Sequence, residues 1–122
     1  MILGPPSSPL DVSSISAVRS RNSLGISWKP PKYNGNETIY QYQVAIKYTV
    51  TGQEMVIKKN TTSLNYTARG LQSETKYSFM VRALNKLFGP GPWNEPIVSD
   101  FTKPGKLTAA FIIYSIHVTR FV

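Results

Sequence analysis

The strongest constraint on the fold is a two-residue alternation in the second half of the chain. Tyr77, Phe79, Val81 and Ala83 are apolar or aromatic, and the positions between them are mostly polar. Successive side chains of a β-strand point to opposite faces, so this pattern predicts a strand with one face in a core. No segment shows a sustained helical period of 3.6 residues. The sequence therefore predicts an all-β protein.

The same alternation recurs between turn residues along the chain. At 24–29 it predicts a strand that ends before Pro30-Pro31 and turns Trp28 inward. At 39–48 it predicts a strand with a bulge near its start. Shorter strands are expected near 10–18, at 55–57, at 64–68 with Leu64, Tyr66 and Ala68 inward, and near 97–102. Turns or loops are expected at 60–63 and 85–92.

Seven short strands separated by turns every 8 to 12 residues are typical of an antiparallel β-sandwich. We expect residues 1–8 to be a proline-rich linker, 9–102 to be the domain, and 103–122 to be a tail outside it. The apolar stretch 107–122 holds only 13 residues between Lys106 and Arg120. As a helix these span about 20 Å, less than the roughly 30 Å of a bilayer core, so no direct membrane insertion is expected.

Five linked segments give the pattern a more specific interpretation. They are Pro9-Leu10-Asp11-Val12, Leu24-Gly25-Ile26-Ser27-Trp28-Lys29-Pro30-Pro31, Ile39-Tyr40-Gln41-Tyr42-Gln43-Val44, the stretch 71–77, and the stretch 77–85 followed by Gly89-Pro90-Gly91-Pro92-Trp93. In this order and spacing they resemble a fibronectin type III domain over residues 6–102. The resemblance implies an immunoglobulin-like sandwich of seven strands, with sheets A-B-E and G-F-C-C′.

The resemblance also assigns structural roles to single residues. It implies that Trp28 is the core tryptophan of the second strand. It implies that Tyr77 is the corner tyrosine, whose hydroxyl bonds back to the backbone before the sixth strand. Ser73 stands where the family usually has proline, which is expected to loosen that turn slightly.

Residues for catalysis or metal binding are scarce. The chain has no cysteine and a single histidine, His117, which lies in the expected tail. Thiol chemistry, a disulfide framework and a histidine-based triad are therefore excluded or nearly so. The six acidic residues are isolated in the sequence, and no glycine-rich loop leads into a helix. We expect no enzyme activity, no cofactor and no metal.

The charge balance points to possible anionic partners. Fourteen basic and six acidic residues give a net charge of +8. Five basic side chains are expected to project from one sheet as a stripe that binds a sulfated polysaccharide: Lys47, Lys58, Lys59, Lys76 and Arg82. The alternative is a solvated surface that resists edge pairing. Nucleic acid is not expected, since exposed positions lack the interleaved aromatics that stack bases.

Three sequons match the acceptor pattern for N-glycosylation, at Asn36, Asn60 and Asn65. Asn36 and Asn60 are expected in loops, and Asn65 is expected to point outward between inward-facing Leu64 and Tyr66. We expect all three to be reachable. The alternative is that the sequons are accidents of a Ser- and Thr-rich strand protein.

A loop tip offers a candidate contact for a protein partner. The stretch 85–92 carries Leu87 and Phe88 near its tip, and the family topology places it beside the loop that contains Tyr33. Tyr33, Leu87 and Phe88 are therefore candidate partner-binding residues. The alternative is that Leu87 folds over the core edge and Phe88 packs on Trp93 or a proline.

The resemblance implies a noncatalytic module that binds proteins and spaces domains in a larger receptor or adhesion protein at the cell surface. Its partners would be a protein ligand or neighbouring domains. A second interpretation is an intracellular structural module of the cytoskeletal or sarcomeric kind, in which the sequons carry no meaning. Glycans would distinguish the two.

Overall fold

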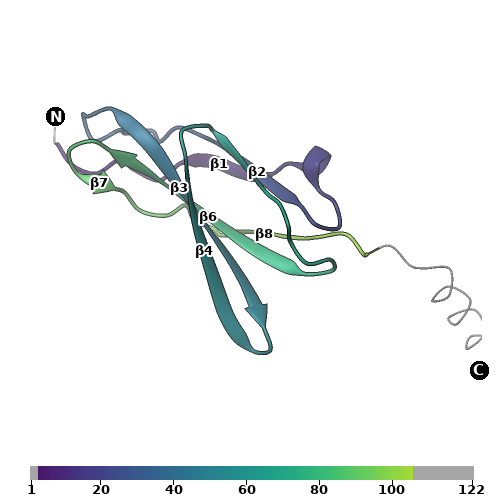
Figure 1. The fold of residues 1–122 in the computed structure, drawn as a ribbon. Coiled ribbons are helices and arrows are strands. Elements are labelled where there is room, and N and C mark those ends of the chain that lie inside the picture. Colours follow the sequence, from purple (N-terminus) through teal and green to yellow (C-terminus); the bar gives the residue numbers. More distant parts are fainter. Residues whose placement is uncertain (1–2, 106–122) are drawn as a thin grey trace, which may run out of the picture.

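A computed structural model describes residues 3–105 as a sandwich of two antiparallel sheets (Figure 1). The first sheet has the order β1 (Leu10–Ser14), β2 (Leu24–Lys29), β5 (Asn65–Ala68). In the second, β4 (Gln53–Thr61) pairs with β3 (Ile39–Val50), which pairs with β6 (Lys76–Asn85). Two short strands, β7 (Gly89–Pro90) and β8 (Val98–Phe101), both pair with β6. The predicted all-β sandwich and its sheet order are confirmed.

The core lies between the two sheets and is formed by the inward positions of β2, β3 and β6. Trp28 is 3% exposed, and its ring centroid lies 5.5 Å from that of Tyr42. Tyr77 is buried beside Tyr48, and along β6 burial alternates as the sequence predicted. The predicted bulge at the start of β3 is present, where the pairing with β6 shifts between Ile39 and Gln41.

The first strand is shorter than expected. β1 ends at Ser14, and one 3₁₀ turn (Ser16–Val18) replaces the predicted continuation to residue 18. This turn folds back on β2, where a side chain at Gly25 would collide with Val18. Because Gly25 has no side chain, the 3₁₀ turn can pack against β2, and the chain leaves the sheet edge after Ser14.

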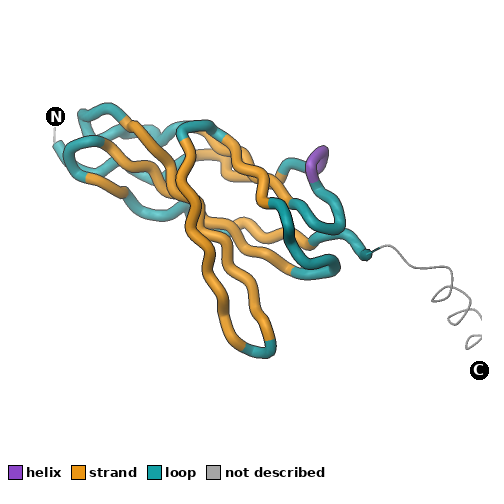
Figure 2. The backbone as a smooth tube through the Cα atoms, in the orientation of Figure 1, coloured by secondary structure: helices purple, strands orange, loops and turns teal. Residues whose placement is uncertain are grey.

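The hairpin of β3 and β4 is longer than predicted and extends beyond the rest of the sandwich (Figures 1 and 2). Its two-residue turn, Thr51-Gly52, has φ angles of 47° and 80°, as type I′ hairpin turns require. Pairing then runs without a shift to Tyr42 opposite Thr61. The expected turn at 60–63 is therefore wrong in part, because Asn60 and Thr61 belong to β4. Leu64 is also not inward, since it is 40% exposed just before β5.

The last strand is split, and a side chain fills the gap. Between β7 and β8, the Asn94 backbone N–H donates to the Val81 carbonyl (3.0 Å), and the Val81 N–H donates to Asn94 Oδ1 (2.7 Å). The same amide donates through Nδ2 to the Pro96 carbonyl (3.1 Å). Asn94 is 4% exposed. It therefore pairs with β6 in place of a regular strand residue, in a segment where Pro92 and Pro96 interrupt the pairing.

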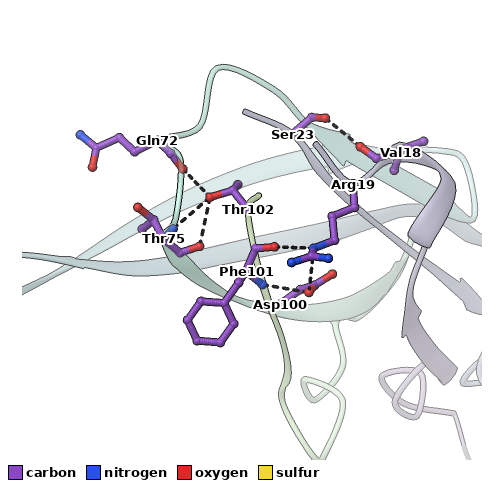
Figure 3. A network of polar contacts seen from close by, with 8 residues as sticks. All are labelled: Val18, Arg19, Ser23, Gln72, Thr75, Asp100, Phe101 and Thr102. Carbon is purple, nitrogen blue, oxygen red and sulfur yellow. Dashed lines mark hydrogen bonds and ion pairs between the residues drawn. The ribbon is translucent and has the colours of Figure 1, made fainter. Parts of the chain in front are cut away.

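The chain leaves the sandwich through a compact polar network, which we call the exit end (Figure 3). Thr102 Oγ1 donates to the Gln72 carbonyl (2.6 Å) and accepts from the Thr75 N–H (3.0 Å). The Tyr77 hydroxyl accepts from the Gln72 N–H (3.0 Å). Arg19 Nε donates to the Phe101 carbonyl (2.6 Å). The turn that holds Ser73 is thus fixed by hydrogen bonds on both sides.

No helix within 3–105 is long and apolar enough to cross a membrane. The apolar stretch 107–122 lies outside the described residues.

Candidate functional site

The opposite end, where the chain enters, gathers the lead-in at 3–8, the loop at 30–38 and the turn at 86–88. We call it the entry end. The lead-in is bound to the sandwich, unlike the linker that its composition indicated. The Gly4 N–H donates to the Gly35 carbonyl (3.2 Å), and the Ser7 N–H donates to the Tyr33 carbonyl (2.8 Å). The Tyr33 N–H in turn donates to Ser7 Oγ (3.0 Å). Pro6, in the same lead-in, is fully buried.

One buried amide joins all three segments of the entry end. Asn85 is fully buried at the end of β6. Its Nδ2 donates to the carbonyls of Gly4 (2.8 Å) and Asn34 (3.1 Å), and its Oδ1 accepts from the Phe88 N–H (2.7 Å). The alternation along β6 already placed residue 85 inward, and a polar group there needs partners. Sequence analysis did not assign it this role.

Two glycines allow the lead-in to lie this close. A Cβ at Gly35 would collide with the Gly4 carbonyl and the Asn85 amide, and Gly35 also has a φ of +79°. A Cβ at Gly91 would collide with the Pro6 carbonyl. A larger residue at either position would push the lead-in away from the sandwich.

The candidate contact residues differ in their exposure. Leu87 and Phe88 are 63% and 40% exposed, so Leu87 does not fold over the core edge. Leu3 is exposed in the neighbouring lead-in and was missed by the sequence analysis. Tyr33 is half-buried, and its hydroxyl is buried without a hydrogen-bond partner among residues 3–105. Leu87 and Phe88 are thus the accessible apolar pair, while Tyr33 packs into the base of the loop.

A shallow hollow of about 700 Å³ lies beside Tyr33, between the 30–38 loop and the turn before β5. Tyr42, Ile39 and Leu64 form its apolar lining, together with Pro30 and Pro31. Burial raises the pKa of the Tyr42 hydroxyl above its usual value, so Tyr42 stays neutral at physiological pH. The hollow offers apolar surface, hydroxyl groups and the Lys32 side chain.

The three sequon asparagines are all exposed. Asn36 lies at the entry end in a left-handed turn with a φ of 62°. Asn60 lies in β4 opposite Gln43, and not in a loop as expected. Asn65 is in β5, opposite Ser27.

The predicted basic stripe is narrower than the sequence indicated. Residues directly opposite each other in an antiparallel pair share a face of the sheet. Lys59 is opposite Val44, which belongs to the hydrophobic core between the sheets, so Lys59 lies on the inner face. Lys58 is its neighbour in the strand and therefore lies on the outer face. The outer face keeps Lys47, Lys58, Lys76 and Arg82.

Two of these four side chains already have partners. Lys47 Nζ lies 3.8 Å from a Glu54 carboxylate oxygen. Arg82 Nε donates to Gln43 Oε1 (2.8 Å), and its guanidinium lies 4.3 Å from the ring centroid of Trp93. These contacts fix Arg82 on the sheet, and of the four side chains only Lys58 and Lys76 have no such partner among residues 3–105. The outer face is therefore a weak candidate for an anionic polymer.

Groups for metal binding or acid–base chemistry do not gather in the described chain. Within residues 3–105, no three His, Cys, Asp or Glu side chains come close enough to hold a metal ion. His117 lies outside the described residues.

Comparison with known proteins places this geometry in a family. The model of the fibronectin type III domain matches residues 5–100. The chain is 30% identical over 106 residues to human Roundabout homolog 2, covering 84% of this chain and 7% of that protein. The fifth fibronectin domain of Drosophila Lar is 28% identical, with a TM-score of 0.64 over 82% of this chain and 99% of that one. Domains A168–A170 of titin are 26% identical, with a TM-score of 0.68 over 81% of this chain and 32% of that one.

Relatives of this chain thus include receptor and adhesion proteins as well as muscle proteins. The chain spans a small fraction of the curated relatives that it matches. Fibronectin type III domains are in general noncatalytic modules that mediate protein–protein contacts, and they also occur in proteins that contain a kinase. With the family model matching 5–100 and the two sheets arranged as the family requires, this chain belongs to the fibronectin type III domain family.

Proposed function

We propose that this chain is an extracellular module of a receptor or adhesion protein, and that it binds a protein partner through the entry end. The observation that carries the proposal is the exposed pair Leu87 and Phe88 on a turn that a buried amide fixes. Phe88 is held through its backbone N–H by Asn85 Oδ1 at 2.7 Å. A fixed backbone lowers the entropic cost of presenting apolar side chains to a partner.

The lead-in supports the same proposal. It is bound to the 30–38 loop and to Asn85, so residues 4–7 hold a fixed direction relative to the turn at 86–88. A module preceding this one in the chain would then sit close to the entry end. The partner is either a separate protein or that preceding module, and both would use the same apolar pair.

The extracellular location is supported by three exposed sequons on three different structural elements. The test is expression of the full chain through the secretory pathway of mammalian cells, followed by mass spectrometry of peptides that contain Asn36, Asn60 and Asn65. We expect a glycan on at least one asparagine. Complete absence of glycans at all three would contradict the extracellular proposal.

Asn36 links the two parts of the proposal. It lies in the same loop as Tyr33, so a glycan there would occupy space at the entry end. Full occupancy at Asn36 combined with retained partner binding would move the contact to a sheet face. The outcome at Asn36 therefore constrains where a partner can bind.

A second candidate is an intracellular structural module. The likeness to titin at a TM-score of 0.68 favours it. In that case sequons are not modified, and the two ends of the domain contact neighbouring modules of the same chain. Absence of glycans at all three asparagines would favour this second candidate.

A further inference from the structure

The free edge of the five-stranded sheet is the longest regular edge in the described chain. β4 has nine residues and pairs only with β3, without a register shift. The opposite edge is split into β7 and β8 and interrupted by prolines. In the other sheet, β1 carries a register shift and β5 has four residues. Natural edges usually carry a proline, a bulge, a break or charged side chains that prevent pairing. Of these, β4 has only charged side chains, at Glu54, Lys58 and Lys59.

The register shows which backbone groups of β4 are free. A two-residue turn makes Val50 and Gln53 a hydrogen-bonded pair. Pairs then alternate along the hairpin, so Glu54, Val56 and Lys58 occupy non-hydrogen-bonded positions. Their N–H and C=O groups point away from β3. These three residues therefore present a row of free donors and acceptors at the edge.

The side chains along this edge form a self-complementary pattern. The segment reads Glu54-Met55-Val56-Ile57-Lys58, with an acid at one end, a base at the other and apolar residues between. Met55 and Val56 are 40% and 45% exposed. If a second copy pairs antiparallel about Val56, each Glu54 lies opposite Lys58 of the other copy. Val56 then faces its own equivalent, and Met55 faces Ile57 on the other side of the sheet.

We infer that β4 is a self-association edge, at which a second copy of this chain pairs antiparallel through residues 54–58. The paired edges join the two five-stranded sheets into one continuous sheet. Each copy contributes the free backbone groups of Glu54, Val56 and Lys58, and two Glu–Lys pairs fix the register. A slip by two residues, the smallest that again brings free backbone groups together, would set Lys58 or Glu54 opposite Val56, so the charges select this arrangement. The present contact of Glu54 with Lys47 is loose, at 3.8 Å, and does not prevent a second cation from approaching.

Charge reversal tests this register. The full 122-residue chain, produced in bacteria and therefore without glycans, is compared by sedimentation velocity over a wide range of concentration with E54K and K58E. Both residues are exposed, so the fold is expected to be kept, which thermal unfolding checks. Each reversal turns two attractive cross-strand pairs into repulsive ones, so we expect self-association to weaken about tenfold or more.

Mixing the two variants gives the decisive result. An E54K chain presents two cations to the two carboxylates of a K58E chain, so the mixture should associate at least as strongly as the parent. The double variant E54K/K58E should also recover association with itself. A parent chain that stays monomeric, single reversals that associate like the parent, or a mixture that fails to recover association would each overturn the inference.

A backbone test is independent of charge. V56P removes a free N–H at the centre of the edge while keeping every bond between β4 and β3, because proline is tolerated where the N–H faces solvent. We expect V56P to abolish association and V56T, which keeps the N–H, to retain it. Association of V56P equal to that of V56T would overturn the inference. Binding through Leu87 and Phe88 and glycan occupancy play no part in these measurements, so they leave the proposed function untouched.

Discussion

The two ends of the sandwich are each closed by one buried polar side chain, but the two side chains hold different numbers of segments. At the entry end, the Asn85 amide bonds to the lead-in, the 30–38 loop and the turn at 86–88. At the exit end, Thr102 bonds to two residues of a single turn. An amide offers two donors and an acceptor with two lone pairs, whereas a hydroxyl has one donor. The residue type therefore sets how many segments one position can join.

The ends also differ in what they expose. The entry end leaves Leu87 and Phe88 in solvent on a fixed turn. The exit end uses its polar groups to direct the chain out of the sheet, with the Arg19 side chain on the Phe101 carbonyl (Figure 3). The hydrogen bonds of the entry end thus hold an exposed apolar turn in place, whereas those of the exit end hold the backbone that leaves the sheet.

The largest effect should come from the core that both ends share. Trp28→Ala removes a buried aromatic ring that packs on Tyr42, and such truncations cost about 3 to 5 kcal/mol. This is much of the 5 to 15 kcal/mol that a domain possesses. Denaturant unfolding should show a greatly lowered midpoint. A midpoint near that of the parent would contradict a core role for Trp28.

Asn85→Ala should be next in size, at about 3 kcal/mol, because it leaves two carbonyls and one N–H without their partner. Hydrogen exchange should rise at the Phe88 N–H and across the lead-in, and remain unchanged at the exit end. Lys86→Ala, at the exposed neighbouring position, is the matched control. Equal exchange in both variants would show that Asn85 does not join the three segments.

Thr102→Val should cost less, about 2 kcal/mol. It keeps the shape of the side chain but leaves the Gln72 carbonyl and the Thr75 N–H unpaired. The loss should appear in the unfolding midpoint and in exchange of the turn at 72–75. Thr62→Val at an exposed position serves as the control. A loss larger than that of Asn85→Ala would reverse the order proposed for the two ends.

Leu87→Ser/Phe88→Ser should have the smallest effect on stability, about 1 kcal/mol or less, because Leu87 is 63% exposed and Phe88 40% exposed. Affinity for a protein partner should fall by about 2 kcal/mol or more if the pair is a hot spot. Phe101→Ser changes an exposed aromatic residue at the exit end and should leave affinity unchanged. Unaltered binding of the double variant would place the contact elsewhere.

Much of this arrangement could be read from the sequence, because strands with one buried face carry a local signal. The alternation from Tyr77 to Ala83 and the proline stop after Lys29 predicted β6 and the end of β2. The errors fall where the signal is weak. β4 has solvent on most of its length, so its last two residues, Asn60 and Thr61, were assigned to the turn predicted at 60–63. Lys59 was predicted on the outer face, which is wrong. No residue of β4 is buried, so the sequence does not show which of its alternating positions face inward.

The candidate site was predicted in part. Leu87 and Phe88 stood out as apolar residues in a loop, and their exposure follows from local sequence. Nothing local shows that Asn85 contacts Gly4, which is 81 residues away in the chain. Nor does the composition of the lead-in show that Pro6 is buried.

The sequence by itself determined the fold class, the strand order implied by the family pattern, and the inward faces of β2, β3 and β6. These depend on periodicity and turn residues, which act between neighbours in the chain. The tertiary structure alone decided which loops a buried amide joins, which lysines share a face, and which sheet edge remains free. Those features depend on register and long-range contact, and both are set only when separate strands pack and every buried polar group finds a partner.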